Sequence, residues 1–209
     1  MEKCAHFLVS DPALLCGRWL DEFICEGAYK YHGLHIELGC GKGRFAVETA
    51  QAEQNTLYVA LEKTTNVLIH ALEQADNIGA DNIRFINTMA EEAINFFAPD
   101  EVERIYLNFC DPWPGNRHSK RRLTARKFLE LYSRILQPSG EIHLKTDNLP
   151  FFEFSLREFE SSGFLLLEET RDLHKNGPVG IMTEYELKFY GKGLPIYQCK
   201  MRNRERLNP

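Results

Sequence analysis

The hydrophobic positions of this chain fall into short apolar runs that alternate with amphipathic stretches. Five runs of five or six residues are bounded by polar or turn-forming residues, and they cover 34–38, 57–61, 83–88, 104–109 and 141–146. Near-continuous apolar runs of this length are typical of strands that are buried on both faces. We therefore expect five central strands.

Amphipathic stretches between these runs predict helices at 44–53, over a stretch that includes 68–75 and ends near 79, at 124–136 and at about 151–162. The second has apolar residues at i, i+3, i+4 and i+7, which are Leu68, Ala71, Leu72 and Ala75. For the third, we expect Thr124 to be the N-cap, with Leu123 and Phe128 forming a hydrophobic staple around it.

Strand and helix alternate in the way that predicts an α/β fold with a mostly parallel sheet. Two further strands, at 164–169 and 185–190, have no helix predicted between them, so we expect them to form an antiparallel edge. Residues 1–33 form a helical or irregular preamble, and residues 34–209 form the main domain.

The charge of the chain is segregated along the sequence. The net charge is −5, which by itself argues against a nucleic-acid partner. However, residues 116–127 contain six basic residues and no acidic one, and residues 188–206 contain six basic residues and one acidic. A local basic face can bind phosphates while the acidic remainder keeps the protein soluble.

Cysteine usage and hydropathy indicate a cytoplasmic protein. None of the six cysteines forms a C-x-x-C pair, so we expect free thiols and no metal site. No run approaches the roughly 18 apolar residues of a membrane helix. The first 20 residues lack the basic-then-apolar order of a signal peptide.

A glycine-rich turn follows the first predicted strand. Gly39, Gly41 and Gly43 alternate with other residues, which lets the backbone turn tightly and approach a ligand. The spacing fits neither a dinucleotide-binding fingerprint nor a phosphate-binding P-loop. Glu37 would repel a pyrophosphate but attract a cationic amino acid or a sulfonium. Glu62, at the end of the second strand, is placed to bind ribose hydroxyls.

The run Asp111-Pro112-Trp113-Pro114 follows the fourth strand and predicts a rigid loop that holds a base. Aromatic faces stack on bases, and a carboxylate such as Asp111 accepts hydrogen bonds from N1–H and the 2-amino group of guanine. A basic cluster follows directly and predicts phosphate contacts beside the base pocket. Its members are Arg117, Lys120, Arg121 and Arg122.

Together these residues resemble the bacterial tRNA (guanine-N7)-methyltransferase family. The resemblance extends from about residue 35 to 190. Its motifs are E-x-G-x-G-K-G (37–43), the strand-end Glu62, N-F-C-D-P-W-P (108–114) with the tail R-H-x-K-R-R-L (117–123), Thr146-Asp147, and T-x-Y-E (183–186).

The resemblance implies a Rossmann-like class I fold and methyl transfer from S-adenosylmethionine to N7 of guanosine 46 in the tRNA variable loop. Asp111 would be the catalytic residue. The cofactor would be bound by Glu37, Gly39, Gly41, Gly43, Glu62, Met89, Ala90 and Asp111, with Met89 standing where the family usually has Asp. The guanosine would be held at Gly115, where the family usually has Lys, and by Asp147, Thr183 and Glu186.

Three alternatives remain open at this point. The chain could be a methyltransferase for another substrate, although the basic cluster argues against that. It could be a non-catalytic RNA-binding module that keeps the fold. It could be a nicotinamide oxidoreductase, which the glycine spacing disfavours. The expected partner is tRNA, without membrane or metal, and the protein is expected to be a monomer or a homodimer.

Overall fold

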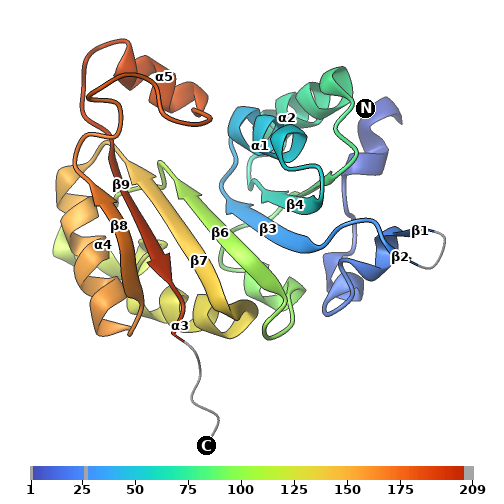
Figure 1. The fold of residues 1–209 in the computed structure, drawn as a ribbon, viewed down its shortest axis with the longest axis horizontal. Helices are drawn as coiled ribbons and strands as arrows, with labels where there is room; N and C mark the ends of the chain where they lie inside the picture. The colour runs from blue at the N-terminus through green and yellow to red at the C-terminus, as the bar shows by residue number, and fades with distance from the viewer. Residues whose placement is uncertain (1, 26–27, 205–209) are drawn as a thin grey trace, which may run out of the picture.

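In the computed structural model, which describes residues 2–25 and 28–204, the fold is built on a seven-stranded sheet (Figure 1). The strand order is β5-β4-β3-β6-β7-β9-β8. The parallel strands are β3 (Gly33–Leu38), β4 (Thr56–Leu61), β5 (Ile83–Ile86), β6 (Val102–Asn108) and β7 (Leu136–Thr146). β9 (Tyr197–Arg202) pairs antiparallel with β7 and with β8 (Leu165–Thr170). The expected mostly parallel sheet with an antiparallel edge is confirmed.

The strand order reverses between β3 and β6. From β3 the chain runs outward through β4 to β5, and then returns to the other side of β3 to form β6. The carboxyl ends of β3 and β6 therefore lie side by side, with Glu37 opposite Tyr106. Open α/β sheets bind ligands in the crevice outside such a reversal point.

Helices pack on both faces of the sheet, as Figure 1 shows for α1 (Arg44–Ala52) and α2 (Thr65–Ile78) near β3 and β4, and for α3 (Arg126–Ile135) and α4 (Leu149–Ser161) near β7 and β9. Successive side chains of β4 enter different cores. Val59 packs in the cluster that contains Phe128 of α3, whereas Ala60 packs in the cluster that contains Ala71 of α2. Burial on both faces explains the near-continuous apolar runs of these strands.

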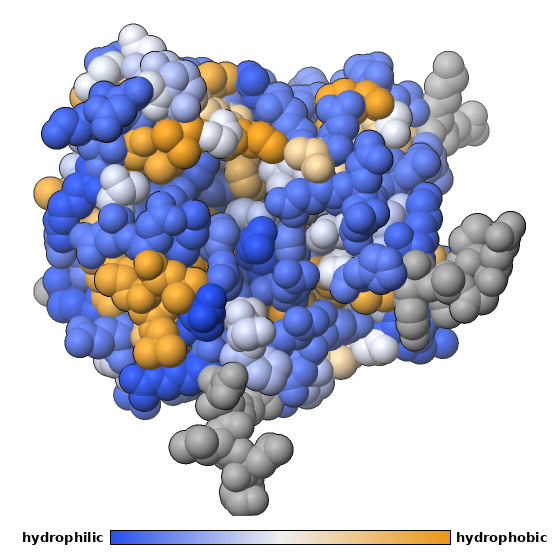
Figure 2. Space-filling model, in the orientation of Figure 1, coloured by the Kyte–Doolittle hydropathy of each residue, from blue (hydrophilic) through white to orange (hydrophobic). Residues whose placement is uncertain are grey.

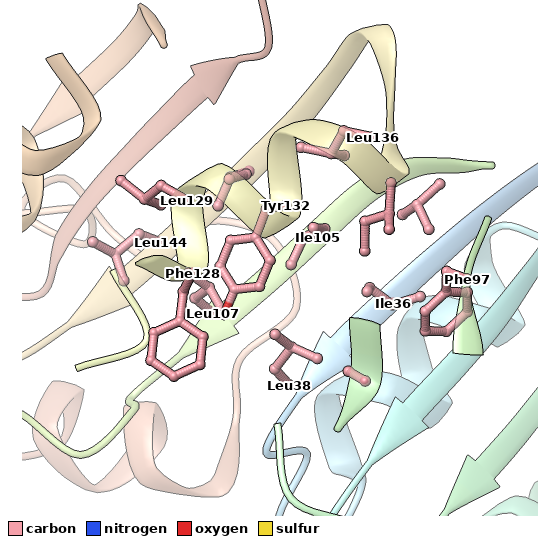
Figure 3. Packing of buried hydrophobic residues seen from close by; sticks show 14 of the residues in the cluster. Ile36, Leu38, Phe97, Ile105, Leu107, Phe128, Leu129, Tyr132, Leu136 and Leu144 are labelled. Atoms are coloured by element: carbon pink, nitrogen blue, oxygen red, sulfur yellow. The ribbon is translucent and has the colours of Figure 1, made fainter. Parts of the chain in front are cut away.

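The larger core lies between the sheet and the helices α3 and α4. Figure 3 shows side chains of β3 and β6 meeting the apolar face of α3. The labelled contacts come from Ile36, Leu38, Ile105, Leu107, Phe128, Leu129 and Tyr132. This packing fixes the directions of β3 and β6, from whose ends the ligand-facing turns leave.

The first 32 residues contribute a large side chain to this core. They form the 3-10 helices η1 (Glu2–Phe7), η2 (Pro12–Leu15) and η3 (Asp21–Phe23), and the strands β1 (Ile24–Cys25) and β2 (Ala28–Tyr29). Trp19 is fully buried, stacks on Phe97 at 5.4 Å between ring centroids, and donates its indole N–H to the Phe96 carbonyl at 2.7 Å. Phe96 ends the 3-10 helix η4 (Ala93–Phe96).

The expected cap of α3 is wrong by one residue. The N-cap is Ala125, whose side chain makes no capping hydrogen bond, and the Arg126 amide of the first turn donates to the Glu158 carboxylate of α4 at 2.8 Å. Thr124 is instead fully buried, and its hydroxyl forms a 2.7 Å hydrogen bond with the Ser155 hydroxyl of α4. Its oxygen therefore joins the segment before α3 to α4 and does not accept from the first turn of α3.

The expected last strand at 185–190 is wrong, because these residues form the helix α5 (Glu184–Tyr190). Its first turn is a capping box. The Thr183 hydroxyl accepts from the Glu186 amide at 2.9 Å, and the Glu186 carboxylate accepts from the Thr183 amide at 3.2 Å. This reciprocal pair satisfies two backbone donors that a helix start otherwise leaves free. The strand that closes the sheet comes later, as β9.

The surface is mostly polar in the view of Figure 2, with an apolar patch over the edge strand β8. Three consecutive leucines, Leu165, Leu166 and Leu167, are exposed on this strand. Among the described residues, no helix combines the length and the apolar character that crossing a bilayer would need. Cys4, Cys16, Cys40, Cys110 and Cys199 are free thiols, while the side chain of Cys25 lies outside the described part.

We predict that Gly43→Ala destabilises the fold by about 3 kcal/mol. Gly43 has φ +87°, and an added Cβ would lie 2.4 Å from Cβ and 2.8 Å from Cα of Ala71 in α2. Gly79→Ala is the matched control, since Gly79 has φ +69° but no atom within 4 Å of the added carbon. That variant should lose only about 1 kcal/mol. Urea unfolding measures the loss of unfolding free energy in both variants. Equal losses would mean that the contact of the added carbon with Ala71 does not contribute.

Candidate active site

A cavity of about 450 Å³ opens at the carboxyl ends of β3, β4 and β6. Its walls come from four segments that are far apart in the sequence. They are Leu38 and Gly39, then Leu61, Glu62 and Lys63, then Thr88 to Glu91, and finally Asn108 to Asp111 with Trp113, Arg121 and Leu123. The cavity therefore lies at the reversal point of the sheet.

The cavity brings together six of the residues expected to bind ligands: Gly39, Glu62, Met89, Ala90, Asp111 and Arg121. Ten other expected residues are not part of its wall: Glu37, Gly41, Gly43, Gly115, Arg117, Lys120, Arg122, Asp147, Thr183 and Glu186.

Glu37 is buried at the end of β3, with 1% of its surface exposed. The Asn108 side-chain amide, at the end of β6, donates to Oε1 of Glu37 at 2.8 Å. Oε2 is buried and has no hydrogen-bond partner among the described residues. Burial raises the pKa of Glu37 to about 7, although the Asn108 bond opposes this. The end of β3 thus holds a buried carboxylate with one oxygen that has no partner among the described residues.

Asn108 is a site residue that the sequence did not single out by itself. Asn108 is the last residue of β6, and Glu37 is the next-to-last residue of β3, so their side chains meet only because these two strands are neighbours. The strand order is the missing information, and the sequence pattern does not contain it.

Glu62 holds the glycine turn from the end of β4. Its Oε2 accepts from the Gly41 amide at 3.1 Å, and its Oε1 accepts from the Thr64 amide at 2.8 Å. Each carboxylate oxygen can accept a second hydrogen bond, and the side chain is part of the cavity wall. Glu62 can therefore shape the turn and bind a hydroxyl donor at the same time.

The segment after β5 adds an apolar wall to the cavity. Met89 is exposed over half of its surface, and Ala90 beside it is half-buried. The backbone here is tied to β4, because the Thr88 amide and the Asn87 side chain both donate to the Glu62 carbonyl, at 3.2 and 2.8 Å. An apolar surface of this kind suits the flat face of a base.

The Asp111–Pro114 loop leaves β6 in an unusual backbone conformation. Phe109 has φ +52° and Trp113 has φ +41°, both in the left-handed region that non-glycine residues rarely adopt. Asp111 is exposed at the cavity, and Oδ2 lies 3.9 Å from Nζ of Lys63. The loop therefore presents one solvated carboxylate and one aromatic face to the same opening.

The basic cluster occupies the 3-10 helix η5 (Asn116–Arg121) and the residue after it. Arg117, Lys120 and Arg121 are exposed, and the Arg121 guanidinium lies 4.9 Å from the centre of the Trp113 ring. Arg122 is half-buried and donates to the carbonyls of Pro112 and Trp113. Gly115, at the N-cap of η5, is exposed and has φ +85°.

A buried ion pair fastens α5 to the end of β7. Nζ of Lys145 lies 3.1 Å from both carboxylate oxygens of Glu186, which has no exposed surface. The His174 imidazole forms a 2.8 Å hydrogen bond with Oε1 of Glu186. Together with the Thr183 amide, these groups use both Glu186 oxygens. Lys145 is a further residue that the sequence did not identify, since its partner lies 41 positions away.

Comparison with known proteins agrees with this geometry. A family model described as "Putative methyltransferase" matches residues 32–199. The tRNA (guanine-N(7)-)-methyltransferase of Geobacillus sp. (strain WCH70) is 46% identical, over 94% of this chain and 88% of its own length. The enzyme of the same name from Bacillus velezensis (strain DSM 23117 / BGSC 10A6 / LMG 26770 / FZB42) is 43% identical, over 97% and 93%.

Solved structures share the fold at low sequence identity. The 16S rRNA methyltransferase KamB aligns with a TM-score of 0.61 at 12% identity, over 84% of this chain and 89% of that one. A SAM-dependent methyltransferase from Aquifex aeolicus aligns with a TM-score of 0.57 at 14% identity, over 97% of both chains. The fold is therefore the Rossmann-like fold of class I methyltransferases.

We predict that Glu186→Gln lowers the free energy of unfolding by about 3–5 kcal/mol, because it leaves the buried Lys145 ammonium without a counter-charge. Glu184→Gln makes the same change two residues earlier, outside this ion pair, and should cost less than about 1 kcal/mol. Chemical denaturation of both variants makes the comparison. Equal losses would mean that the ion pair does not hold α5 in place.

Proposed function

The chain belongs to the tRNA (guanine-N7)-methyltransferase family, and on that premise we propose that it methylates N7 of guanosine 46 in the tRNA variable loop with S-adenosylmethionine as methyl donor. The observation that carries the proposal is the shared cavity, whose wall includes Glu62, Asp111 and Trp113. One opening thus combines groups suited to a nucleoside cofactor with groups suited to a guanine. We further propose that the protein acts in the cytoplasm, as a monomer or a homodimer.

The cofactor fits the donors and acceptors of the site. The free Oε2 of Glu37 is a buried acceptor that a cationic amino acid group would satisfy. Glu62 would bind the ribose hydroxyls, and the backbone of Met89 and Ala90 would contact the adenine. Gly39 lines the cavity, where the glycine turn would let the backbone approach the ligand, and Asp111 borders the same cavity. When bound, S-adenosylmethionine supplies a methyl group on a positively charged sulfur.

The protein's part in the reaction is mainly to orient the guanine. N7 of guanine has a free lone pair, so no general base is needed. Asp111 would accept hydrogen bonds from N1–H and the 2-amino group, and its charge would favour the positive purine that forms. Trp113 would stack on a base. Fixing the reacting atoms in line is an effect of proximity and orientation, which contributes several kcal/mol in enzymes.

The remaining candidates for holding the guanosine lie on three segments outside the cavity wall. Gly115 follows the Asp111–Pro114 loop, Asp147 follows β7, and Thr183 begins α5. We propose that these three contact the nucleoside. Glu186 lies in the same segment as Thr183, but both of its oxygens are already bonded, so we assign it to holding that segment.

The exposed cations of η5 would bind the tRNA backbone. Arg117, Lys120 and Arg121 stand on the segment that follows the base-holding loop. Phosphate contacts of this kind set the position of the nucleic acid, while contacts to base edges provide specificity. The second basic segment, 188–206, continues beyond the described residues after 204.

The proposal is tested by methyl transfer from labelled S-adenosylmethionine to tRNA transcripts that carry G or A at position 46. We expect label only on the G transcript, with cleavage mapping the product to N7. Asp111→Ala should lose more turnover than cofactor affinity. Equal labelling of both transcripts would assign another substrate position, and normal turnover of Asp111→Ala would remove its catalytic role.

We also predict that cofactor binding releases a proton from Glu37 below about pH 7. Burial raises the pKa of Glu37 to about 7, so the free protein holds this carboxyl protonated at pH 6. A bound cation favours the carboxylate and lowers its pKa, so affinity should rise with pH up to about 7. Calorimetry at pH 6 in two buffers of different ionisation enthalpy measures the released proton. The release should be absent in Glu37→Gln, and an unchanged release there would assign it to another group.

A further inference from the structure

The loop that presents Asp111 carries backbone strain on both sides. Phe109 precedes the acid with φ +52°, and Trp113 follows with φ +41°. A non-glycine residue in this region costs about 1 kcal/mol or more, and it persists only when surrounding contacts determine it. The loop therefore depends on groups outside itself to stay in this conformation.

The Arg122 guanidinium supplies such contacts. Nε donates to the Pro112 carbonyl at 2.9 Å, and Nη2 donates to the Trp113 carbonyl at 3.0 Å. Nε also lies 3.4 Å from the Trp113 carbonyl. The planar guanidinium can place two donors on neighbouring carbonyls at once, which a lysine ammonium cannot reproduce.

The Arg122 side chain also packs against α4. The Arg122 guanidinium lies 4.3 Å from the centre of the Phe154 ring. Two residues further on, the buried Thr124 hydroxyl is bonded to Ser155, the neighbour of Phe154. Arg122 is thus fixed between a rigid helix and the loop. Turning the guanidinium away from the loop to face solvent would break both of its hydrogen bonds to the half-buried carbonyls.

We propose that Arg122 is a positioning residue that clamps the Asp111–Pro114 loop in its strained conformation, and that it does not bind the RNA backbone. The proposal rests on the function proposed above for the loop. The basic cluster then has two parts. Arg117, Lys120 and Arg121 are exposed and able to contact the nucleic acid, whereas Arg122 faces the loop. Loosening the clamp lets Asp111 and Trp113 move, and a displacement of about 1 Å in such a site can cost about 100-fold in rate.

The test compares Arg122→Lys with Lys120→Ala, which removes an exposed cation of the same segment. Arg122→Lys keeps the charge and loses the paired donors. It should lower kcat by about 10- to 100-fold at saturating tRNA, and leave the slope of log KM against log salt unchanged. Lys120→Ala should reduce that slope by about one.

A second readout needs no activity. The chain has two tryptophans, and Trp19 is fully buried, so acrylamide quenching of the fluorescence of the tRNA-free protein reports on Trp113. Quenching should increase in Arg122→Lys and stay unchanged in Lys120→Ala. Phe154→Leu removes the surface under the guanidinium without altering any charge, and it should raise quenching in the same direction.

Each outcome decides the proposal. Increased quenching with an unchanged salt slope supports the clamp, and circular dichroism confirms that the compared variants are folded. A reduced salt slope with unchanged quenching and kcat would make Arg122 a phosphate ligand and overturn it. If the unmodified protein does not methylate tRNA, the proposed function fails, while quenching in Arg122→Lys and Phe154→Leu still tests the clamp.

Discussion

The hydrogen bond between Asn108 and Glu37 joins the ends of β3 and β6 at the reversal point of the sheet. It is made inside the protein, where an unpaired carboxylate is costly, so it ties the placement of Glu37 to the pairing of these two strands. The glycine turn leaves from the end of β3, and the Asp111–Pro114 loop leaves from the end of β6. The relative position of the two ligand-facing segments therefore depends on this junction.

A charged side chain from a different part of the chain holds each of these two segments. Glu62 accepts from the Gly41 amide of the glycine turn, and Arg122 donates to the carbonyls of Pro112 and Trp113 in the loop. In each case a full charge meets backbone dipoles, which gives stronger bonds than those between neutral groups. The conformation of each segment is thus set before any ligand binds, which limits the ordering that binding must pay for.

The sequence predicted the five central strands because burial on both faces leaves near-continuous apolar runs, which are hard to confuse with amphipathic helices. It failed at α5, where Tyr185, Leu187 and Phe189 alternate with charged residues in the period of a strand. The capping box at Thr183 and Glu186 decides the helix. The roles of Arg122, Lys145 and Glu186 were beyond prediction for another reason: tertiary packing chooses the partner of a charged side chain, and periodicity does not record it.

The carboxylates at this edge of the sheet differ in how many acceptor positions remain. Glu186 is fully buried with both oxygens bonded, so it can only hold structure. Glu62 bonds one amide with each oxygen and keeps further lone pairs toward the cavity, whereas Glu37 keeps one oxygen entirely unpartnered. Asp111 is exposed. Remaining acceptor capacity thus separates Glu186, which holds structure, from Glu37, Glu62 and Asp111, which keep acceptors for a ligand, and of these Glu62 and Asp111 line the cavity.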